Sequence, residues 1–116
     1  MSKRDWRILV DDIISSVNKI ENYVAGLTFE EFDQNSMIID AVVRNLEIIG
    51  EAATKIPDEI QVENTQVPWK KLKGIRNRII HEYFAIDTSI IWFIAQNEIH
   101  QLRENLNKIN PHDRPE

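Results

Sequence analysis

The sequence predicts an all-α protein, an antiparallel bundle of four long helices plus a short helical turn. Helix-breaking residues are scarce, with 3 Gly and 4 Pro in 116 residues. Apolar residues recur at steps of three and four along most of the chain, which is the spacing of one helix face. The hydrophobic fraction of 42% and the charged fraction of 28% are those of a globular domain. We therefore expect a single domain over residues 1–116, long enough to bury a core.

The first helix is predicted to begin near Trp6 and to end near Gly26, a suitable C-terminal stop. Its apolar positions are Trp6, Leu9, Val10, Ile13, Val17, Ile20, Val24 and Leu27. The next residues, Thr28 to Glu31, have the pattern of a capping box, with Thr28 as the N-cap. They predict a short helical turn that continues through Phe32.

The second long helix is predicted from Asn35 or Ser36 to Ile56, where Pro57 stops it. Its apolar stripe comprises Ile38, Ile39, Val42, Leu46, Ile49, Ala53 and Ile56. At 100° per residue, three charged side chains fall within about 60° of one another on another face. They are Arg44, Glu47 and Glu51, which we assign as supporting residues of a site. Residues 57–68 are expected to form a polar connection.

The third helix is predicted from Pro68 or Trp69 to about Tyr83. A fourth follows, capped by Asp87 or Thr88 and running to about Ile109. Residues 109–116 are expected to be a frayed tail.

Several classes of protein are excluded at this level. The chain has no Cys, so it has no disulfide framework, thiolate nucleophile or Cys-based zinc site. Its longest stretch without Asp, Glu, Lys or Arg is the ten residues from Thr88 to Asn97, whereas a membrane helix needs about 20 apolar residues. The first residues lack the apolar stretch of a secretory signal. We expect a soluble, cytoplasmic protein without metal or cofactor.

The charge is unevenly distributed along the chain. The formal net charge is −5, which argues at first against a nucleic-acid partner. However, the stretch from Trp69 to Arg78 carries five positive and no negative charges. These residues are Lys70, Lys71, Lys73, Arg76 and Arg78. Because ionic screening confines charge effects to about 10 Å, such a stripe can bind phosphate on an acidic protein. A solvated helix face is the alternative interpretation.

The third helix also carries a combination of residues suited to RNA cleavage. Arg76 projects near the apolar side on a helical wheel, so it needs an acceptor, either Glu47 or Glu51 or a substrate phosphate. Asn77 and His81 lie at i and i+4 on another face. Arginine offers a fixed fork to phosphate oxygens, and histidine exchanges protons near neutral pH. In RNA the 2′-OH is the nucleophile, so these groups suffice for metal-independent cleavage.

Other interpretations of these residues stay open. Arg76 is also explained by a structural ion pair, and His81 by a satisfied, half-exposed histidine. On an ideal helix the two lie about 140° apart, so a two-fold dimer could combine residues from both copies. For the whole protein, the alternative is a non-catalytic helical adaptor that binds a nucleotidyltransferase or RNA. A helix-turn-helix DNA binder is weaker, because that motif uses a turn of 3–4 residues.

The signature Arg76-Asn77-Arg78-Ile79-Ile80-His81-Glu82-Tyr83 resembles the R-x4-H-x-Y motif of the HepT-like proteins, a branch of the all-helical HEPN ribonucleases. The likeness extends in order over about residues 4 to 108. Three further blocks carry it: Tyr23 to Phe32, Ala41 to Ala52, and Val67 to Leu72.

This resemblance implies a HEPN-like fold and a homodimer whose signature helices form a composite RNase site. Arg76 and His81 would be catalytic and Asn77 would support them. From their charge, we expect Lys70, Lys71, Lys73 and Arg78 to bind the RNA, possible substrates including tRNA. It further implies the toxin of a type VII-like toxin–antitoxin system. There an MntA-type nucleotidyltransferase antitoxin would silence the toxin by AMP transfer to Tyr83.

Overall fold

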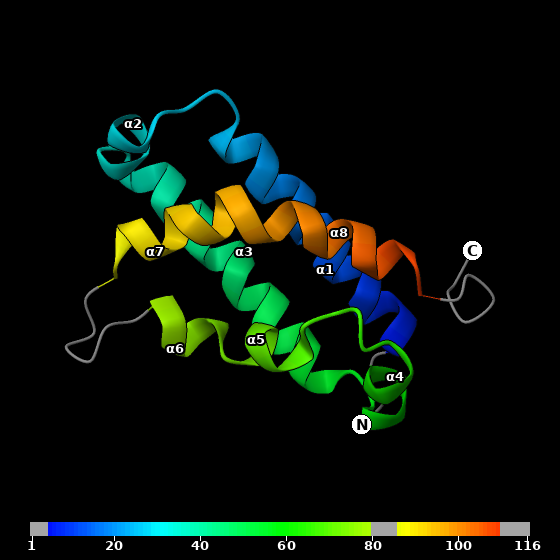
Figure 1. The fold of residues 1–116 in the computed structure, drawn as a ribbon. Helices are drawn as coiled ribbons and strands as arrows, with labels where there is room; N and C mark the ends of the chain where they lie inside the picture. The colour runs from blue at the N-terminus through cyan, green and yellow to red at the C-terminus, as the bar shows by residue number, and fades with distance from the viewer. Residues whose placement is uncertain (1–4, 80–85, 110–116) are drawn as a thin grey trace.

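The computed structural model describes residues 5–79 and 86–109, and within these ranges the regular secondary structure is helical throughout (Figure 1). The prediction of an all-α fold is confirmed. No helix of the described residues is long and apolar enough to cross a membrane.

The two longest helices, α1 (Trp6–Val24) and α3 (Ser36–Lys55), lie against each other as an antiparallel pair (Figure 1). Most of both predicted apolar stripes is buried in the core, and Trp6, Leu27 and Ile38 are partly buried against it. The Asp5 side chain caps α1 by accepting from the Arg7 N–H, and Asn35 caps α3 by accepting from the Ile38 N–H at 3.1 Å. Such caps satisfy backbone donors that the first helical turn leaves without partners.

The short helix α2 (Phe29–Asp33) connects this pair and forms as predicted. The Glu31 N–H donates to Thr28 Oγ1 at 3.2 Å, and the Thr28 N–H donates to Glu31 Oε1 at 2.9 Å. Both halves of the capping box are therefore present. Ahead of it, Gly26 adopts φ +76°, a conformation that glycine allows without steric cost.

The third predicted helix is interrupted, and its lead-in is partly helical. Residues expected to form a polar connection include α4 (Asp58–Glu63). The helix that follows is divided at Gly74 into α5 (Trp69–Lys73) and α6 (Ile75–Ile79). The predicted continuation to Tyr83 falls on residues 80–85, outside the described residues. The prediction of an unbroken third helix was thus wrong at Gly74.

The fourth predicted helix begins at its predicted cap but is not a uniform α-helix. Asp87 Oδ1 accepts from the Ser89 and Ile90 N–H groups, and α7 (Thr88–Phe93) follows. It continues through a π turn, η1 (Ile94–Glu98), into α8 (Ile99–Asn107). Ile109, which we expected to begin the frayed tail, is buried, and residues 110–116 lie outside the described residues.

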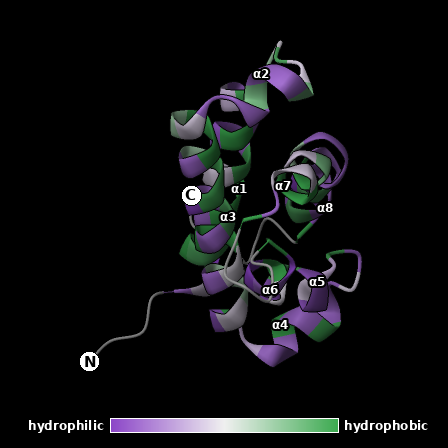
Figure 2. Ribbon diagram, turned by 90° about the vertical axis from the view of Figure 1, so that its left-hand side faces the viewer, coloured by the Kyte–Doolittle hydropathy of each residue, from purple (hydrophilic) through white to green (hydrophobic). Residues whose placement is uncertain are grey.

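The helices form two layers around one core. Viewed from the side, α1 and α3 form one layer, and α5, α6, α7 and α8 lie across them (Figure 2). A Cβ added at Gly50 of α3 would lie 3.1 Å from Leu72 O and 3.4 Å from Ile75 Cγ2. This glycine lets α3 approach α5 and α6 closely, and so sets the position of the helix that carries the signature.

Candidate functional site

The signature residues on α6 project in different directions. Ile75 and Ile79 are buried and hold the helix on the core. At 100° per residue, Arg76 and Arg78 project about 80° to either side of this buried stripe, and Asn77 points away from the core. Arg76 and Asn77 are both exposed. The two arginines of the signature therefore serve opposite flanks of one helix.

Arg76 lines a small hollow on the flank that faces α3. The hollow is lined by Glu47, Gly50, Glu51, Thr54, Lys73, Ile75 and Arg76. The sequence predicted Glu47 and Glu51 as neighbours of Arg76, and they do line the same hollow. Arg76 is nonetheless exposed rather than set in the apolar stripe, and the part of the chain that the structure describes gives it no ion pair. Its guanidinium is available to an anion.

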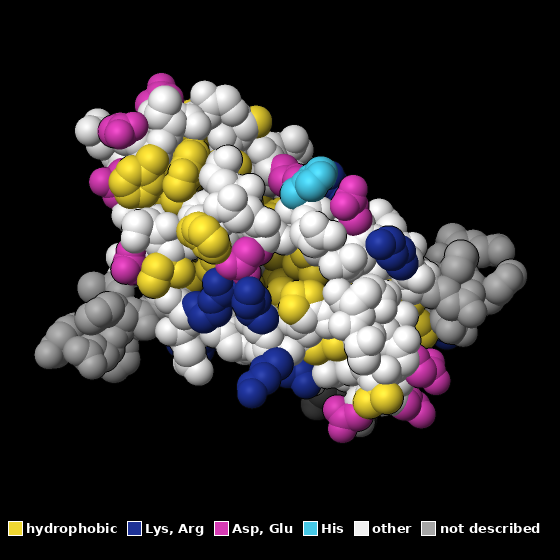
Figure 3. Space-filling view, viewed as in Figure 1, with side chains coloured by type: hydrophobic (Ala, Val, Ile, Leu, Met, Phe, Trp, Pro, Cys, Tyr) yellow, Lys and Arg dark blue, Asp and Glu magenta, His cyan; other side chains and the backbone are white. Residues whose placement is uncertain are grey.

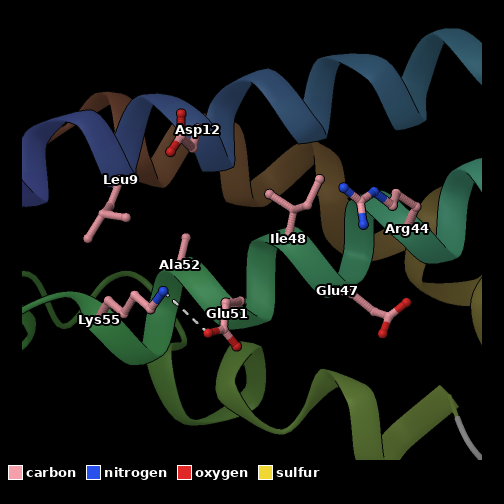
Figure 4. Close-up of a pocket in the computed structure, with 8 residues that line it drawn as sticks. All are labelled: Leu9, Asp12, Arg44, Glu47, Ile48, Glu51, Ala52 and Lys55. Atoms are coloured by element: carbon pink, nitrogen blue, oxygen red, sulfur yellow. Dashed lines mark ion pairs between the residues drawn. The ribbon is translucent and has the colours of Figure 1, made fainter. Parts of the chain in front are cut away.

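A larger groove adjoins this hollow along α3 and α1 (Figure 4). Arg44, Glu47 and Glu51 line it together, as their shared helix face predicted. In the close-up, Lys55 reaches Glu51, and the two side chains pair at 3.4 Å. Since Glu47 and Glu51 line both hollows, a continuous surface that carries charged side chains runs from Arg44 to Arg76.

Arg78 makes a two-pronged ion pair on the opposite flank. Its Nη1 donates to Glu98 Oε1 at 2.9 Å, and its Nη2 donates to Glu98 Oε2 at 2.6 Å. Lys71 Nζ lies 3.8 Å from Glu98 Oε1. The hydrogen bonds from Arg78 lower the pKa of Glu98 although its partial burial opposes this, and those same bonds raise the pKa of Arg78. Both groups are thus held in their charged forms.

The five basic residues do not form one stripe. Lys73 lies with Arg76 on the flank facing α3, whereas Lys71 lies with Arg78 beside Glu98. Lys70 is exposed. Figure 3 shows basic side chains gathered below an acidic one near the centre of this face. The single stripe expected from the sequence is therefore divided between two surfaces by the turn of the helix.

The other signature residues, His81 and Tyr83, lie in 80–85, outside the described residues. The residues that flank this stretch are joined, because the Asp87 N–H donates to Ile79 O at 3.2 Å. Their assignment as catalytic residue and modification site stays a prediction.

The sequence analysis missed Glu98, which contacts two of the predicted RNA-binding residues. A signal for it existed. In an uninterrupted α-helix Glu98 would lie about 20° from the buried Ile91 around the helix axis. A carboxylate in an apolar stripe needs a cationic partner, and every charged residue from Lys70 to Arg78 is basic.

Within residues 5–79 and 86–109, no three His, Asp or Glu side chains come together as a metal-binding group.

Comparisons with known proteins identify relatives across nearly the whole chain. A family model described as "Ribonuclease HepT-like" matches residues 13–109. "Putative RNase MJ0125" of Methanocaldococcus jannaschii is 39% identical over 109 residues, which cover 94% of each chain. "Probable ribonuclease HepT" of Thermococcus cleftensis is 31% identical over 107 residues, 92% of this chain and 97% of that protein.

A third relative, "Putative RNase TTE0752" of Caldanaerobacter subterraneus, is 36% identical over 103 residues, 89% of this chain and 92% of its own. No solved structure matches. An all-helical fold, an exposed Arg76 at the start of the signature and a family match over residues 13–109 agree, and the chain belongs to the HepT-like ribonuclease family.

Proposed function

We propose that this protein is a metal-independent endoribonuclease whose catalytic residues are Arg76 and His81, with Asn77 in support. The observation that carries the proposal is the exposed guanidinium of Arg76 beside Lys73, in a chain whose relatives are named RNases. Membership of the family supports the reaction class. Side chains from helices of both layers are buried in one core cluster, which supports a single HEPN-like domain over residues 1–116.

The proposed reaction needs only proton transfer and charge stabilisation. The 2′-oxygen attacks the adjacent phosphorus while the bond from phosphorus to the 5′-oxygen breaks. The His81 imidazole accepts the 2′-OH proton, and the imidazolium so formed gives a proton to the leaving 5′-oxygen. Arg76 stabilises the negative charge that grows on the phosphoryl oxygens. The products are a 2′,3′-cyclic phosphate and a 5′-hydroxyl.

The site is proposed to be composite. Arg76 and His81 lie about 140° apart on an ideal helix, so one copy does not aim both at the same phosphate. A two-fold homodimer brings Arg76 of one copy and His81 of the partner subunit to one phosphate. The surface with charged side chains from Arg44 to Arg76 lies along the flank of α6 that faces α3, and we assign Arg44, Glu47 and Glu51 to supporting this arrangement.

RNA would approach over the basic side chains of α5 and α6. Lys70 and Lys73 have no ion pair within the described part of the chain, and they are the primary candidates for phosphate contacts. Lys71 and Arg78 would contribute only if they shared or gave up Glu98. An RNA substrate, such as a tRNA, places the proposed activity in the cytoplasm.

We further propose a toxin role in a type VII-like toxin–antitoxin system. The resemblance of the signature to R-x4-H-x-Y supports it. An MntA-type nucleotidyltransferase would transfer AMP to Tyr83, two residues from His81. A bulky, charged group there would block access of RNA to the site.

The test is RNA cleavage by the purified protein in excess EDTA, with analysis of the product ends. We expect cleavage that leaves 2′,3′-cyclic or 3′-phosphate ends. Loss of cleavage in EDTA would refute the metal-free mechanism. RNA bound but left intact would favour a non-catalytic adaptor that binds RNA or a nucleotidyltransferase.

A further inference from the structure

The segment that carries Arg76 meets the core along a narrow line of side chains. The described part of α6 is Ile75–Ile79. Gly74 separates it from α5. Its buried side chains, Ile75 and Ile79, form a single line along one face. A helix held along one line can roll about that line, and the roll decides where Arg76 points.

A contact on the opposite flank from Arg76 limits this roll. The Arg78 guanidinium reaches Glu98 through two hydrogen bonds of 2.9 and 2.6 Å. Two parallel bonds between planar groups fix direction as well as distance. Since Arg76 and Arg78 project about 80° to either side of the buried line, holding one sets the position of the other.

The π turn is what brings Glu98 to Arg78. Glu98 is the last residue of η1, which interrupts the run from α7 into α8. A π turn contains more residues than an α turn, so it rotates the residues that follow relative to α7. In a regular helix Glu98 would share the azimuth of the buried Ile91; here it lies at the side facing α6.

The contact is partly protected from water. The Arg78 side chain is 29% exposed and that of Glu98 is 22% exposed. Lys71 of α5 approaches the same carboxylate at 3.8 Å. Glu98 therefore ties both halves of the interrupted helix to η1, and its interaction is screened less than that of a fully exposed pair.

We propose that Glu98 is a positioning residue for RNA cleavage: by holding Arg78 it sets the roll of α6 and so aims Arg76 at the scissile phosphate. The proposal rests on the proposed ribonuclease function. It assigns a role to the π turn and removes Arg78 from the set of simple RNA contacts.

The experiment compares Glu98→Gln with the control Glu104→Gln, an exposed carboxylate on α8. Glu98→Gln is expected to lower kcat for RNA cleavage about tenfold or more, because misplacement of a catalytic group by an ångström is costly. KM should change less than about twofold. The exchanged pair Arg78→Glu with Glu98→Arg should restore much of the lost rate. Glu104→Gln should match the wild type.

A double-mutant cycle separates aiming of Arg76 from a general structural role. If Glu98 acts through Arg76, Glu98→Gln will have no further effect on the residual rate of Arg76→Ala. An equal loss in both backgrounds, or wild-type kcat in Glu98→Gln, would overturn the proposal.

Hydrogen exchange decides the matter if the wild-type protein cleaves no RNA. That result would refute the proposed function, but the exchange rates of the α6 amides would still show whether Glu98 holds this helix in place. Glu98→Gln should speed their exchange and Glu104→Gln should not. Unchanged exchange in Glu98→Gln would show that Glu98 does not hold α6.

Discussion

At the scale of single residues, we propose that Arg76 binds an anion rather than stabilising the fold. It is exposed, it borders a hollow with Lys73, and within the described ranges it has no ion pair. Its removal should therefore cost activity and not stability. This separates it from Arg78, whose guanidinium is occupied by Glu98.

We expect Arg76→Ala to lower RNA cleavage by about 100-fold or more, the usual cost of one donor to a developing oxyanion. Its melting temperature should stay within about 1–2 °C of the wild type, as for most exposed substitutions. Cleavage rates and thermal melts measure both. Lys19→Ala, at an exposed position of α1, is the control. Full cleavage by Arg76→Ala would remove it from the catalytic residues.

Tyr83→Phe is expected to keep ribonuclease activity but to escape AMP transfer, since it lacks only the acceptor hydroxyl. Mass spectrometry after incubation with an MntA-type nucleotidyltransferase and ATP would detect the added AMP. An adenylylated Tyr83→Phe protein would place the modification on another residue.

At the scale of helices, local signals were predictable and tertiary ones were not. The caps at Thr28 and Asp87 were found from sequence because a cap depends on a few adjacent residues. The break at Gly74 and the π turn at Ile94–Glu98 were missed. Gly74 offered a local signal, since glycine is a weak helix former, but the apolar spacing continues across it; that spacing carries no signal for the π turn.

The division of the basic stripe has a local cause, the geometry of the helix. A count along the chain places Lys71, Lys73, Arg76 and Arg78 together, but the turn of the helix separates them onto two flanks. That Glu47 and Glu51 line the same surface was predictable, because both lie on one uninterrupted helix.

Gly50→Ala is expected to separate α3 from α5 and α6. The new Cβ would meet the backbone of Leu72 at 3.1 Å, and a backbone atom cannot move aside cheaply. The cost of overpacking, about 1–3 kcal/mol, exceeds the gain of about 1 kcal/mol in helix propensity. We expect a lower melting temperature and slower RNA cleavage.

Gly74→Ala is the matched control for that change. A Cβ at Gly74 would lie 3.5 Å from Lys70 O, an ordinary contact, and its φ of −88° suits any residue. Its stability should equal or exceed that of the wild type. Equal stability of the two alanine variants would contradict a close approach of the helices at Gly50.

The contact between α6 and η1 should make stability depend on pH. Because Arg78 lowers the folded pKa of Glu98 below its ordinary value of 4.5, the contact stabilises the fold above that value. This contribution is lost as the pH falls through the lower, folded pKa. Glu98→Gln should therefore be less stable than the wild type at pH 7, by about 1 kcal/mol.

The difference in unfolding free energy between the two proteins should shrink as the pH falls below about 4. Urea melts at several pH values measure it. A difference that stays constant from pH 7 to acid would show that the charge of Glu98 contributes nothing to stability.

At the scale of the whole molecule, the central claim is a site shared between two copies. The surface with charged side chains that runs from Arg44 along α3 to Arg76 borders the flank of α6 that faces α3. Family membership supports ribonuclease activity, and the separation of about 140° that an ideal helix would give Arg76 and His81 argues for a contribution from each copy. This claim is tested by mixing subunits that carry different substitutions at the proposed site.

The most direct measurement mixes Arg76→Ala with His81→Ala after unfolding and refolding them together, and follows RNA cleavage. Each variant alone should be inactive. Random pairing makes half of the dimers mixed, and each mixed dimer has one intact site, so about a quarter of wild-type activity should return. A mixture as inactive as its two components, although the subunits have exchanged, would contradict a site built from Arg76 of one copy and His81 of the other.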